Sequence, residues 1–434
     1  MERYWNKTIE TMDREQIRTL QLERLRTTVE NVYTNVPYYR EKMQAKGLMP
    51  GDIKSLDNLK DLPITTKQDL RDTYPFGLFA VPMEDIVRIH ASSGTTGKQT
   101  VVGYTGRDID MLADCMARCF VMEDADKHSR VQVAYGYGLF TGGLGAHYGA
   151  EKLGVVTIPA SSGNTQRQIT MLMDFGVTHI CCTPSYAMNI AEVLYEMGHS
   201  KDDLTLKAGC FGAEPWSDGM RAEIESRLGI RAYDIYGLSE IMGPAVSHEC
   251  RYQKGLHIWE DCFIAEVTDP DTDLPVKEGE PGDLIITTIN KEGFPLIRYK
   301  TRDICTLNHE KCECGRSHVR MSKPAGRTDD MLIIRGVNVF PSQIESVLLS
   351  IGEVQPHYQI VVDRVNNLDT MVVEIEISDT MFSDTVKNIE SFEKNVSSRI
   401  NSVLGINAAI RLVEPKSIAR SEGKAKRVID KRKI

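Results

Sequence analysis

The pattern of apolar and polar residues changes several times along the chain and predicts an ordered series of elements. Leu22, Leu25, Val29 and Val32 recur at helical spacing among charged residues, which predicts an amphipathic helix over residues 14–34. Up to about residue 250, short β-rich runs then alternate with helical stretches; the runs are 131–134, 155–158, 179–182 and 206–209. Strands separated by helices indicate crossover units and a largely parallel sheet.

Alternating strands with turn signals replace this pattern between residues 258 and 307 and predict a small β subdomain. Pro324 and Gly326 then interrupt a polar segment, so a domain boundary is expected near residues 323–330. Beyond it we expect a strand, a helix, two strands, a helix and a strand, at 331–334, 341–350, 359–363, 371–377, 386–400 and 409–413.

The predicted fold class is therefore α/β with two domains. Residues 1–325 would form a large domain of several subdomains, with a mainly parallel sheet and the small β subdomain. Residues 326–434 would form a small α+β domain.

Composition narrows the class of protein without deciding the function. The chain has 434 residues, of which 41% are hydrophobic and 26% charged, as in ordinary globular proteins with more than one core. A net charge of −9 disfavours non-specific binding to nucleic acid. Residues 1–7 lack the apolar core of a signal peptide, and no run is long enough to span a bilayer. We expect no nucleic-acid partner, no membrane partner and a cytoplasmic location.

Residues 92–98, with the sequence SSGTTGK, follow an apolar run at 86–89 that is predicted to be a strand. Their glycines allow close backbone approach, and the hydroxyls and Lys98 can bind a polyphosphate. A Walker loop is excluded, because Ser92 replaces its first glycine and Gln99 follows the lysine. A flexible connector of the same composition is the alternative.

Three further segments combine a turn with chemistry suited to a nucleotide. Tyr236 could stack on a base and Glu240 could bind Mg²⁺, although residues 236–240 could also merely open a helix. Asp303 could accept two ribose hydroxyls, or form only a surface ion pair. Residues 212–215 form a glycine turn after a strand that could contact a nucleotide, and the alternative is a turn without such a role.

Two more segments, at 326–330 and 421–426, follow the motifs described above, and the order of all these motifs along the chain identifies a family. Together the segments resemble the adenylate-forming superfamily of acyl-CoA synthetases, which carries these motifs in this order between residues 92 and 424. Within it the chain is similar to phenylacetate-CoA ligases. The sequence segments that carry this similarity are VPYY at 36–39, HASSGTTGK at 90–98, YGYGLF at 135–140, GAEPW at 212–216 and DDMLIIRGVNVFP at 329–341.

The resemblance implies a two-step reaction with ATP, Mg²⁺ and coenzyme A. An aryl acid attacks the α-phosphate of ATP to give an acyl-adenylate and pyrophosphate, and the CoA thiol then displaces AMP. Phenylacetate is the acid implied by the family; indoleacetate, hydroxylated phenylacetates and benzoates stay open. Two other functions also stay open, namely transfer of the adenylate to another acceptor and an ATP-binding sensor without turnover. A homodimer is a further implication of the resemblance.

The resemblance also implies roles for individual residues. Lys424 would bridge the carboxylate and the α-phosphate, with Lys426 of the same basic tail as the alternative, and Glu240 would help to bind Mg²⁺. Asp329 would be the hinge on which a mobile C-terminal domain turns between the two steps. ATP and AMP would be bound by Ser92, Ser93, Gly94, Thr95, Thr96, Gly97, Lys98, Gly212, Ala213, Glu214, Pro215, Asp234, Tyr236, Gly237, Ser239, Asp303 and Arg327.

Residues 135–140 offer aromatic walls with glycines between them, which suits a flat aryl group. The predicted pocket residues are Tyr135, Tyr137, Gly138 and Phe140, and the alternative is an aromatic strand end within the core.

Cysteine and histidine residues suggest a second site. The ten cysteines are expected to be free thiols or metal ligands rather than a disulfide framework. Cys250, His257, Cys312 and Cys314 make up a Cys₃His set, which is typical of structural zinc. The Cys-x-Cys spacing is shorter than in zinc fingers, and reduced free cysteines are the alternative. The histidines that could replace His257 are His248, His309 and His318.

Overall fold

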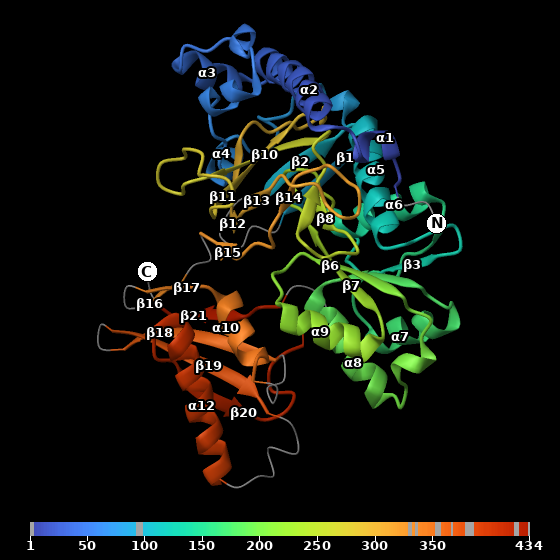
Figure 1. Ribbon diagram of the computed structural model, residues 1–434, viewed down its shortest axis with the longest axis vertical. Coiled ribbons are helices and arrows are strands. Elements are labelled where there is room, and N and C mark those ends of the chain that lie inside the picture. Colours follow the sequence, from blue (N-terminus) through green and yellow to red (C-terminus); the bar gives the residue numbers. More distant parts are fainter. Residues whose placement is uncertain are drawn as a thin grey trace.

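The computed structural model describes residues 4–92, 99–328, 332–334, 337–351, 357–365, 368–377, 386–420 and 425–432. Figure 1 shows a large body that carries the N-terminus and a smaller body, coloured orange to red, beside one end of it. Within the described residues, no helix combines the length and the apolar character needed to cross a bilayer.

The N-terminal helices pack against the large body. They are α1 (Lys7–Glu10), α2 (Arg14–Asn35), α3 (Pro37–Ala45) and α4 (Lys67–Asp72), with short 3₁₀ turns at η1 (Pro50–Asp52), η2 (Leu56–Asp61) and η3 (Met83–Asp85). Asp13 caps α2 by accepting from the Gln16 amide, and the helix buries Leu25, Val29 and Val32. This confirms the helix predicted at 14–34, because its apolar positions form one continuous face.

A nine-stranded sheet forms the centre of the described part of the large body. Its order is β13-β14-β9-β8-β7-β6-β5-β3-β4, and the strands from β7 to β4 are parallel while the others are antiparallel. The parallel strands are β3 (Arg130–Val133), β4 (Val156–Ile158), β5 (His179–Cys182), β6 (Ala208–Gly212) and β7 (Arg231–Tyr236). The antiparallel ones are β8 (Ser247–Glu249), β9 (Leu256–Ile258), β13 (Leu307–Asn308) and β14 (Arg320–Met321).

Helices cover both faces of the parallel part, which confirms the predicted crossover units. They are α5 (Gly106–Met122), α6 (Thr141–Leu153), α7 (Thr165–Asp174), α8 (Pro184–Glu196) and α9 (Asp218–Leu228), with η4 (Lys201–Asp203) before β6. The alternation along β5 shows the two faces: Cys181 joins the core beneath α5 and α6, and Cys182 joins the core beneath α7, α8 and α9. The run predicted at 206–209 is shifted, because β6 begins at Ala208.

Two smaller β units adjoin this sheet. The small β subdomain predicted at 258–307 consists of the antiparallel strands β10 (Phe263–Thr268), β11 (Gly282–Thr288), β12 (Tyr299–Cys305) and β15 (Gly326–Arg327). Its predicted bounds are wrong at the end, because β13 pairs within the nine-stranded sheet and β15 pairs with β12. A hairpin of β1 (Arg88–Ser92) and β2 (Thr100–Tyr104) pairs Ser92 with Thr100. The strand predicted at 86–89 is therefore wrong in its bounds, because Ser92 is a strand residue and its cross-strand pairing extends the strand beyond the apolar run.

The smaller body has its own hydrophobic core, which includes Val396 and Ile400. Its sheet has the order β20-β19-β18-β21, next to a hairpin of β16 and β17. The elements are β16 (Leu332–Ile334), β17 (Val337–Val339), α10 (Pro341–Leu349), β18 (Tyr358–Val365), β19 (Leu368–Glu376), α12 (Val386–Leu404), β20 (Ala409–Val413) and β21 (Val428–Asp430). The predicted order is confirmed, but β17 and β21 were not predicted, because each is defined by its pairing with another strand, β16 and β18 respectively.

Candidate active site

The carboxyl ends of β6 and β7 lie side by side, because the two strands pair in parallel with Gly212 opposite Ile235. The turns that follow them, at 212–215 and 236–240, therefore meet at one edge of the sheet. Open parallel sheets bind ligands at this edge, since loops from neighbouring strands converge there. Two of the predicted nucleotide segments are thus brought together.

Both turns have an unusual backbone. Ala213 has a φ of 70°, in the left-handed region that costs a non-glycine residue about 1–3 kcal/mol. A Cβ on Gly237 would lie 1.9 Å from the carbonyl oxygen of Gly243, so no larger residue fits without moving the backbone. Strain such as that at Ala213 concentrates at functional sites, where the surrounding structure holds it in place.

A cleft beside these turns contains most of the predicted nucleotide residues that the structure describes. Its lining includes Ala213, Glu214, Pro215, Asp234, Tyr236, Gly237, Asp303 and Arg327. It also includes six residues that were not assigned to the nucleotide site: Trp216, Ile235, Leu238, Lys323, Pro324 and Gly326. Trp216 could have been chosen because it follows the predicted turn directly. Lys323 carries no such signal, since its ion pair with Asp218 at 2.8 Å forms only on folding.

Asp303 is the central acidic group of the cleft. It lies on β12 opposite Arg327 of β15 and is 5% exposed. Its Oδ2 accepts a hydrogen bond of 2.6 Å from the Tyr236 hydroxyl, and its Oδ1 lies 3.5 Å from Nη1 of Arg327. Burial and the Asp303 carboxylate raise the pKa of Tyr236 well above its usual value, so the phenol stays protonated and donates.

Asp234 is a second acidic group in the cleft. Burial, and then repulsion by Glu249, raise the pKa of the Asp234 carboxyl to about 7. Near neutral pH this carboxyl group can therefore either accept or donate a hydrogen bond.

Glu240 lies outside the cleft lining and is buried. Its Oε1 accepts a hydrogen bond of 2.7 Å from the Tyr299 hydroxyl. Lys291 donates to the carbonyl oxygens of Glu240 and Ile241 at 3.3 and 2.8 Å. Burial lowers the pKa of Lys291 to about 8. The turn that carries Glu240 is thus held by side chains from two other segments.

The segment 135–141 lies between the end of β1 and the turn after β7. The Ala91 amide donates to the Leu139 carbonyl at 2.9 Å, and the hydroxyls of Thr141 and Ser239 are 3.2 Å apart. The predicted aryl-pocket residues are consequently neighbours of the nucleotide segments.

The aryl-pocket residues differ in burial. Tyr135 and Tyr137 are half-buried, and the Tyr137 hydroxyl lies 3.2 Å from Nδ1 of His147. Gly138 and Phe140 are exposed, with 51% of the Phe140 surface accessible. The segment thus combines two half-buried tyrosines with an exposed phenylalanine.

Several predicted site residues lie outside the described residues; these are Ser93, Gly94, Thr95, Thr96, Gly97, Lys98, Asp329 and Lys424. Ala425, which follows Lys424 directly, is described, and its amide donates to Oε2 of Glu214 at 2.8 Å. Residue 425 of the small body is thus bonded to a residue that lines the cleft.

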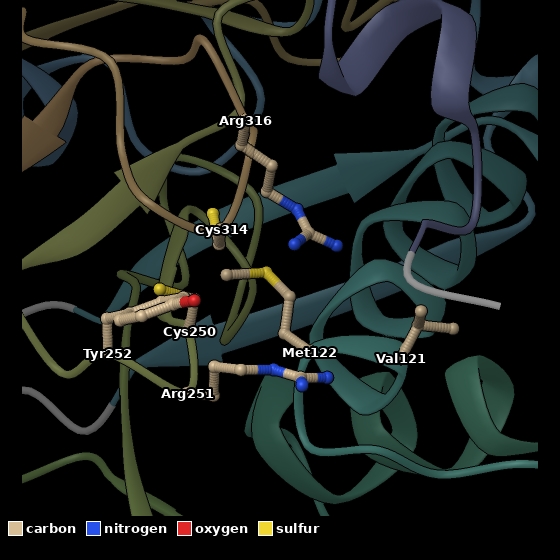
Figure 2. A pocket seen from close by; sticks show the side chains of 7 residues that line it. All are labelled: Val121, Met122, Cys250, Arg251, Tyr252, Cys314 and Arg316. Carbon is tan, nitrogen blue, oxygen red and sulfur yellow. The ribbon is translucent and has the colours of Figure 1, made fainter. Parts of the chain in front are cut away.

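The predicted Cys₃His set forms a compact cluster. The donor atoms of Cys250, His257, Cys312 and Cys314 all lie within 4.8 Å of one another. Cys250 Sγ and Cys312 Sγ are 3.7 Å apart, and Cys314 Sγ is 3.6 Å from Nε2 of His257. Figure 2 shows the side chains of Cys250 and Cys314 among the residues that line a pocket. This cavity has a volume of about 10 Å³, which has room for about one water molecule.

The cysteines of the cluster are not joined by a disulfide, and the His257 ring in the cluster is neutral. All ten cysteines are free, and the Sγ–Sγ distance is far beyond the roughly 2.05 Å of a disulfide. Burial lowers the pKa of His257, which keeps the ring neutral. The possible substitutes lie elsewhere: His248 pairs with Glu123, His309 with Glu278, and His318 bonds backbone groups.

Family models match both bodies of the chain. The model described as AMP-binding enzyme matches residues 13–290, and the model described as AMP-binding enzyme C-terminal domain matches residues 336–432. Phenylacetate-coenzyme A ligases from Thermus thermophilus and Escherichia coli are 48% and 49% identical to the chain. Each alignment covers 98% of this chain, and they cover 99% and 97% of the two relatives. The chain belongs to the phenylacetate-coenzyme A ligase family of adenylate-forming enzymes.

A solved relative of this ligase shows the same fold. The crystal structure of 2-hydroxyisobutyryl-CoA ligase in its postadenylation state is 30% identical, with a TM-score of 0.93 over 99% of this chain and 92% of the other. The same enzyme in its thioesterification state has a TM-score of 0.73. The α/β fold class is confirmed, and the activity is ATP-dependent ligation of a carboxylic acid to coenzyme A through an acyl-adenylate.

Proposed function

We propose that the ligase converts phenylacetate, ATP and coenzyme A into phenylacetyl-CoA, AMP and pyrophosphate. The observation that carries this proposal is the identity of 48–49% with two phenylacetate-coenzyme A ligases along nearly the whole of each chain. The aromatic segment at 135–140, next to the nucleotide segments, suits an aryl acid.

In the first half-reaction the carboxylate oxygen of the acid forms a bond to the α-phosphorus, and pyrophosphate leaves. Positioning and electrostatic stabilisation supply the catalysis, because negative charge accumulates on the phosphates. Asp303 would accept the ribose hydroxyls, Arg327 would lie near the ribose or the phosphates, and Tyr236 would present its ring to adenine. The hydrogen bond between Tyr236 and Asp303 keeps the two groups in one orientation.

The phosphates would be bound by residues 92–98, and Lys424 would bridge the carboxylate and the α-phosphate. Glu240 fits a Mg²⁺ site in chemistry, since it is a carboxylate oriented by the Tyr299 hydroxyl. When bound, Mg²⁺ supplies positive charge to the phosphate oxygens.

In the second half-reaction the CoA sulfur forms a bond to the acyl carbon, the carbon–oxygen bond to the phosphate breaks, and AMP leaves. The higher similarity to the postadenylation state of 2-hydroxyisobutyryl-CoA ligase supports an arrangement of the domains suited to the first half-reaction. We propose two domains, residues 1–325 and 326–434, with the hinge at Asp329. Because Gly326 and Arg327 pair with β12, these two residues would stay with the large body when the small one turns.

The decisive experiment measures acid-dependent pyrophosphate release from Mg·ATP over a panel of aryl and aliphatic acids, with and without CoA. Phenylacetate should give both pyrophosphate and its CoA thioester, and the thioester is detected by mass spectrometry. If indoleacetate or benzoate releases pyrophosphate faster than phenylacetate does, that acid is the substrate instead. Pyrophosphate release without a thioester would indicate that the acyl group goes to an acceptor other than CoA. Nucleotide binding without turnover of any acid would favour the alternative that the protein is an ATP-binding sensor.

We further propose that the Cys₃His cluster binds a structural zinc ion. With Zn–S near 2.3 Å and Zn–N near 2.0–2.1 Å, a tetrahedral ion separates two sulfurs by about 3.8 Å and a sulfur from a nitrogen by about 3.6 Å. The distances of 3.7 and 3.6 Å in the cluster agree with both values. Four protein ligands leave no position open for substrate, so the ion would join the loop after β8, β9 and the loop between β13 and β14.

The homodimer and the cytoplasmic location stay predictions. Light scattering on the purified ligase would test the first, and a single-chain mass in solution would contradict it.

A further inference from the structure

Glu192 joins the two bodies of the ligase. It lies on α8 of the large body and pairs with two residues of the small body, Arg420 and His357. Its Oε2 accepts from Nε of Arg420 at 3.2 Å, while Oε1 bonds Nε2 of His357. Only 19% of the Glu192 side chain is accessible. Figure 1 shows α8 and α9 on the side of the large body that faces the small one.

Arg420 is held from its other side as well. Its two Nη atoms bind both carboxylate oxygens of Glu376 on β19 at 2.7 and 2.8 Å, and Glu376 also accepts from the Ile418 amide at 2.7 Å. Because both Nη atoms are held by Glu376, a rotation of α8 relative to β19 would lengthen the contact between Arg420 and Glu192. The Glu192–Arg420 contact therefore relates the orientation of β19 to that of α8.

Glu192 is charged when it makes these contacts. Burial opposes ionisation, but the hydrogen bond with His357 and the charge and hydrogen bond of Arg420 outweigh it and lower the pKa of Glu192.

The contacts of Glu192 lie close to the cleft. A small cavity between the two bodies is lined by residues from both, among them Ser185, His357, Arg420 and Ala425. Glu214 accepts from the Ser185 amide at 2.7 Å with one oxygen and from the Ala425 amide at 2.8 Å with the other. Residues 418–420 thus lie beside α8, and the Ala425 amide bonds Glu214, which lines the cleft.

We propose that Glu192 is a positioning residue for the adenylation half-reaction, an inference that rests on the function proposed above. Through Arg420 and His357 it stabilises the arrangement of the two bodies seen here, whose TM-score is 0.93 to one state of 2-hydroxyisobutyryl-CoA ligase and 0.73 to another. Glu192 touches neither the cleft lining nor a predicted substrate residue among its described contacts.

The test separates the two half-reactions in the full-length Glu192→Gln variant, which keeps the shape of the side chain and removes its charge. Pyrophosphate release in the first turnover reports adenylation. Thioester formation from supplied phenylacetyl-adenylate and CoA reports the second step. We expect adenylation to fall about tenfold while thioester formation stays the same or rises, since weakening one charge-assisted contact shifts the population of the arrangement.

Glu196→Gln is the matched control. Glu196 lies on the same helix and pairs with Lys416 of the small body, but the two side chains are 50% and 71% accessible. Exposed ion pairs contribute little, so both half-reactions should change by less than about twofold. Equal loss of both half-reactions in Glu192→Gln, or no change in either, would overturn the inference. A wild-type protein that releases no pyrophosphate with any acid would instead refute the proposed function, before the variants are compared.

Discussion

Replacing Asp303 by asparagine tests the nucleotide site most directly. Asp303 is 5% exposed, accepts from Tyr236 at 2.6 Å and faces Arg327 at 3.5 Å, and asparagine keeps its size while removing its charge. Hydrogen bonds to a charged group contribute about 1.5–3 kcal/mol each. Losing that charge opposite the ribose should raise the KM for ATP and the Kd for AMP roughly ten- to hundredfold.

The assay combines this variant with a modified substrate. Wild-type ligase should bind 2′-deoxy-ATP about tenfold more weakly than ATP, whereas Asp303→Asn should discriminate less than about threefold, because the two changes remove the same interaction. A variant that discriminates as strongly as the wild type would refute a contact between Asp303 and the ribose.

Asp283→Asn provides the control for this experiment. Asp283 is a buried carboxylate on the neighbouring strand β11, 3.3 Å from Lys300 and outside the cleft lining. Asp283 pairs with Ile304, so its side chain lies on the face of the sheet opposite to that of Asp303. Its replacement should lower the stability of the protein and leave the KM for ATP within about twofold.

Three further predictions concern the lysines and the thiols. Lys424→Ala should abolish adenylation and retain AMP binding, with Lys426→Ala as the control; an unchanged adenylation rate in Lys424→Ala would exclude the assigned role. Protein purified without added metal should contain about one equivalent of zinc, and Cys312→Ser should lose it and melt at a lower temperature, whereas Cys305→Ser should keep the metal; wild-type protein without zinc would contradict the site. Because burial lowers the pKa of Lys291 to about 8, the unfolded state binds more protons between that value and about 10.4, so stability from this group rises with pH in that window. The difference in the free energy of unfolding between wild-type ligase and Lys291→Met should therefore rise in favour of the wild type by up to about 3 kcal/mol from about pH 8 to 10.5. A difference that does not change with pH would refute the lowered pKa.

Much of the fold was predictable because its signals are local. The apolar spacing of Leu25, Val29 and Val32 specifies one face of α2, and short apolar runs between helical stretches specify β3, β4 and β5. No such run between helical stretches indicated β17 or β21, which are strands through their pairing with β16 and β18. The bounds of β1 were missed for a related reason: Ser92 is in a strand because it pairs with Thr100, not because of its own side chain.

Several residues of the candidate site could be picked out at the level of motifs, and their roles stay predictions. Tyr236, Asp303 and Glu214 were each chosen from a short pattern, and their order along the chain indicated an adenylate-forming enzyme. The sequence did not connect them to particular partners. It gave no reason to select Lys323, Tyr299 or Lys291, because each of these acquires its role through a contact with a distant segment.

The sequence by itself determined the local elements, the family and the set of reactive groups. Only the tertiary structure decided which of those groups meet: Tyr236 with Asp303, Cys250 with Cys312 and Glu192 with Arg420. These pairs are separated by 67, 62 and 228 positions along the chain. The physical reason is that periodicity and turn chemistry act over a few residues, whereas such contacts depend on strand order, register and the docking of two bodies, which arise from packing of the whole chain.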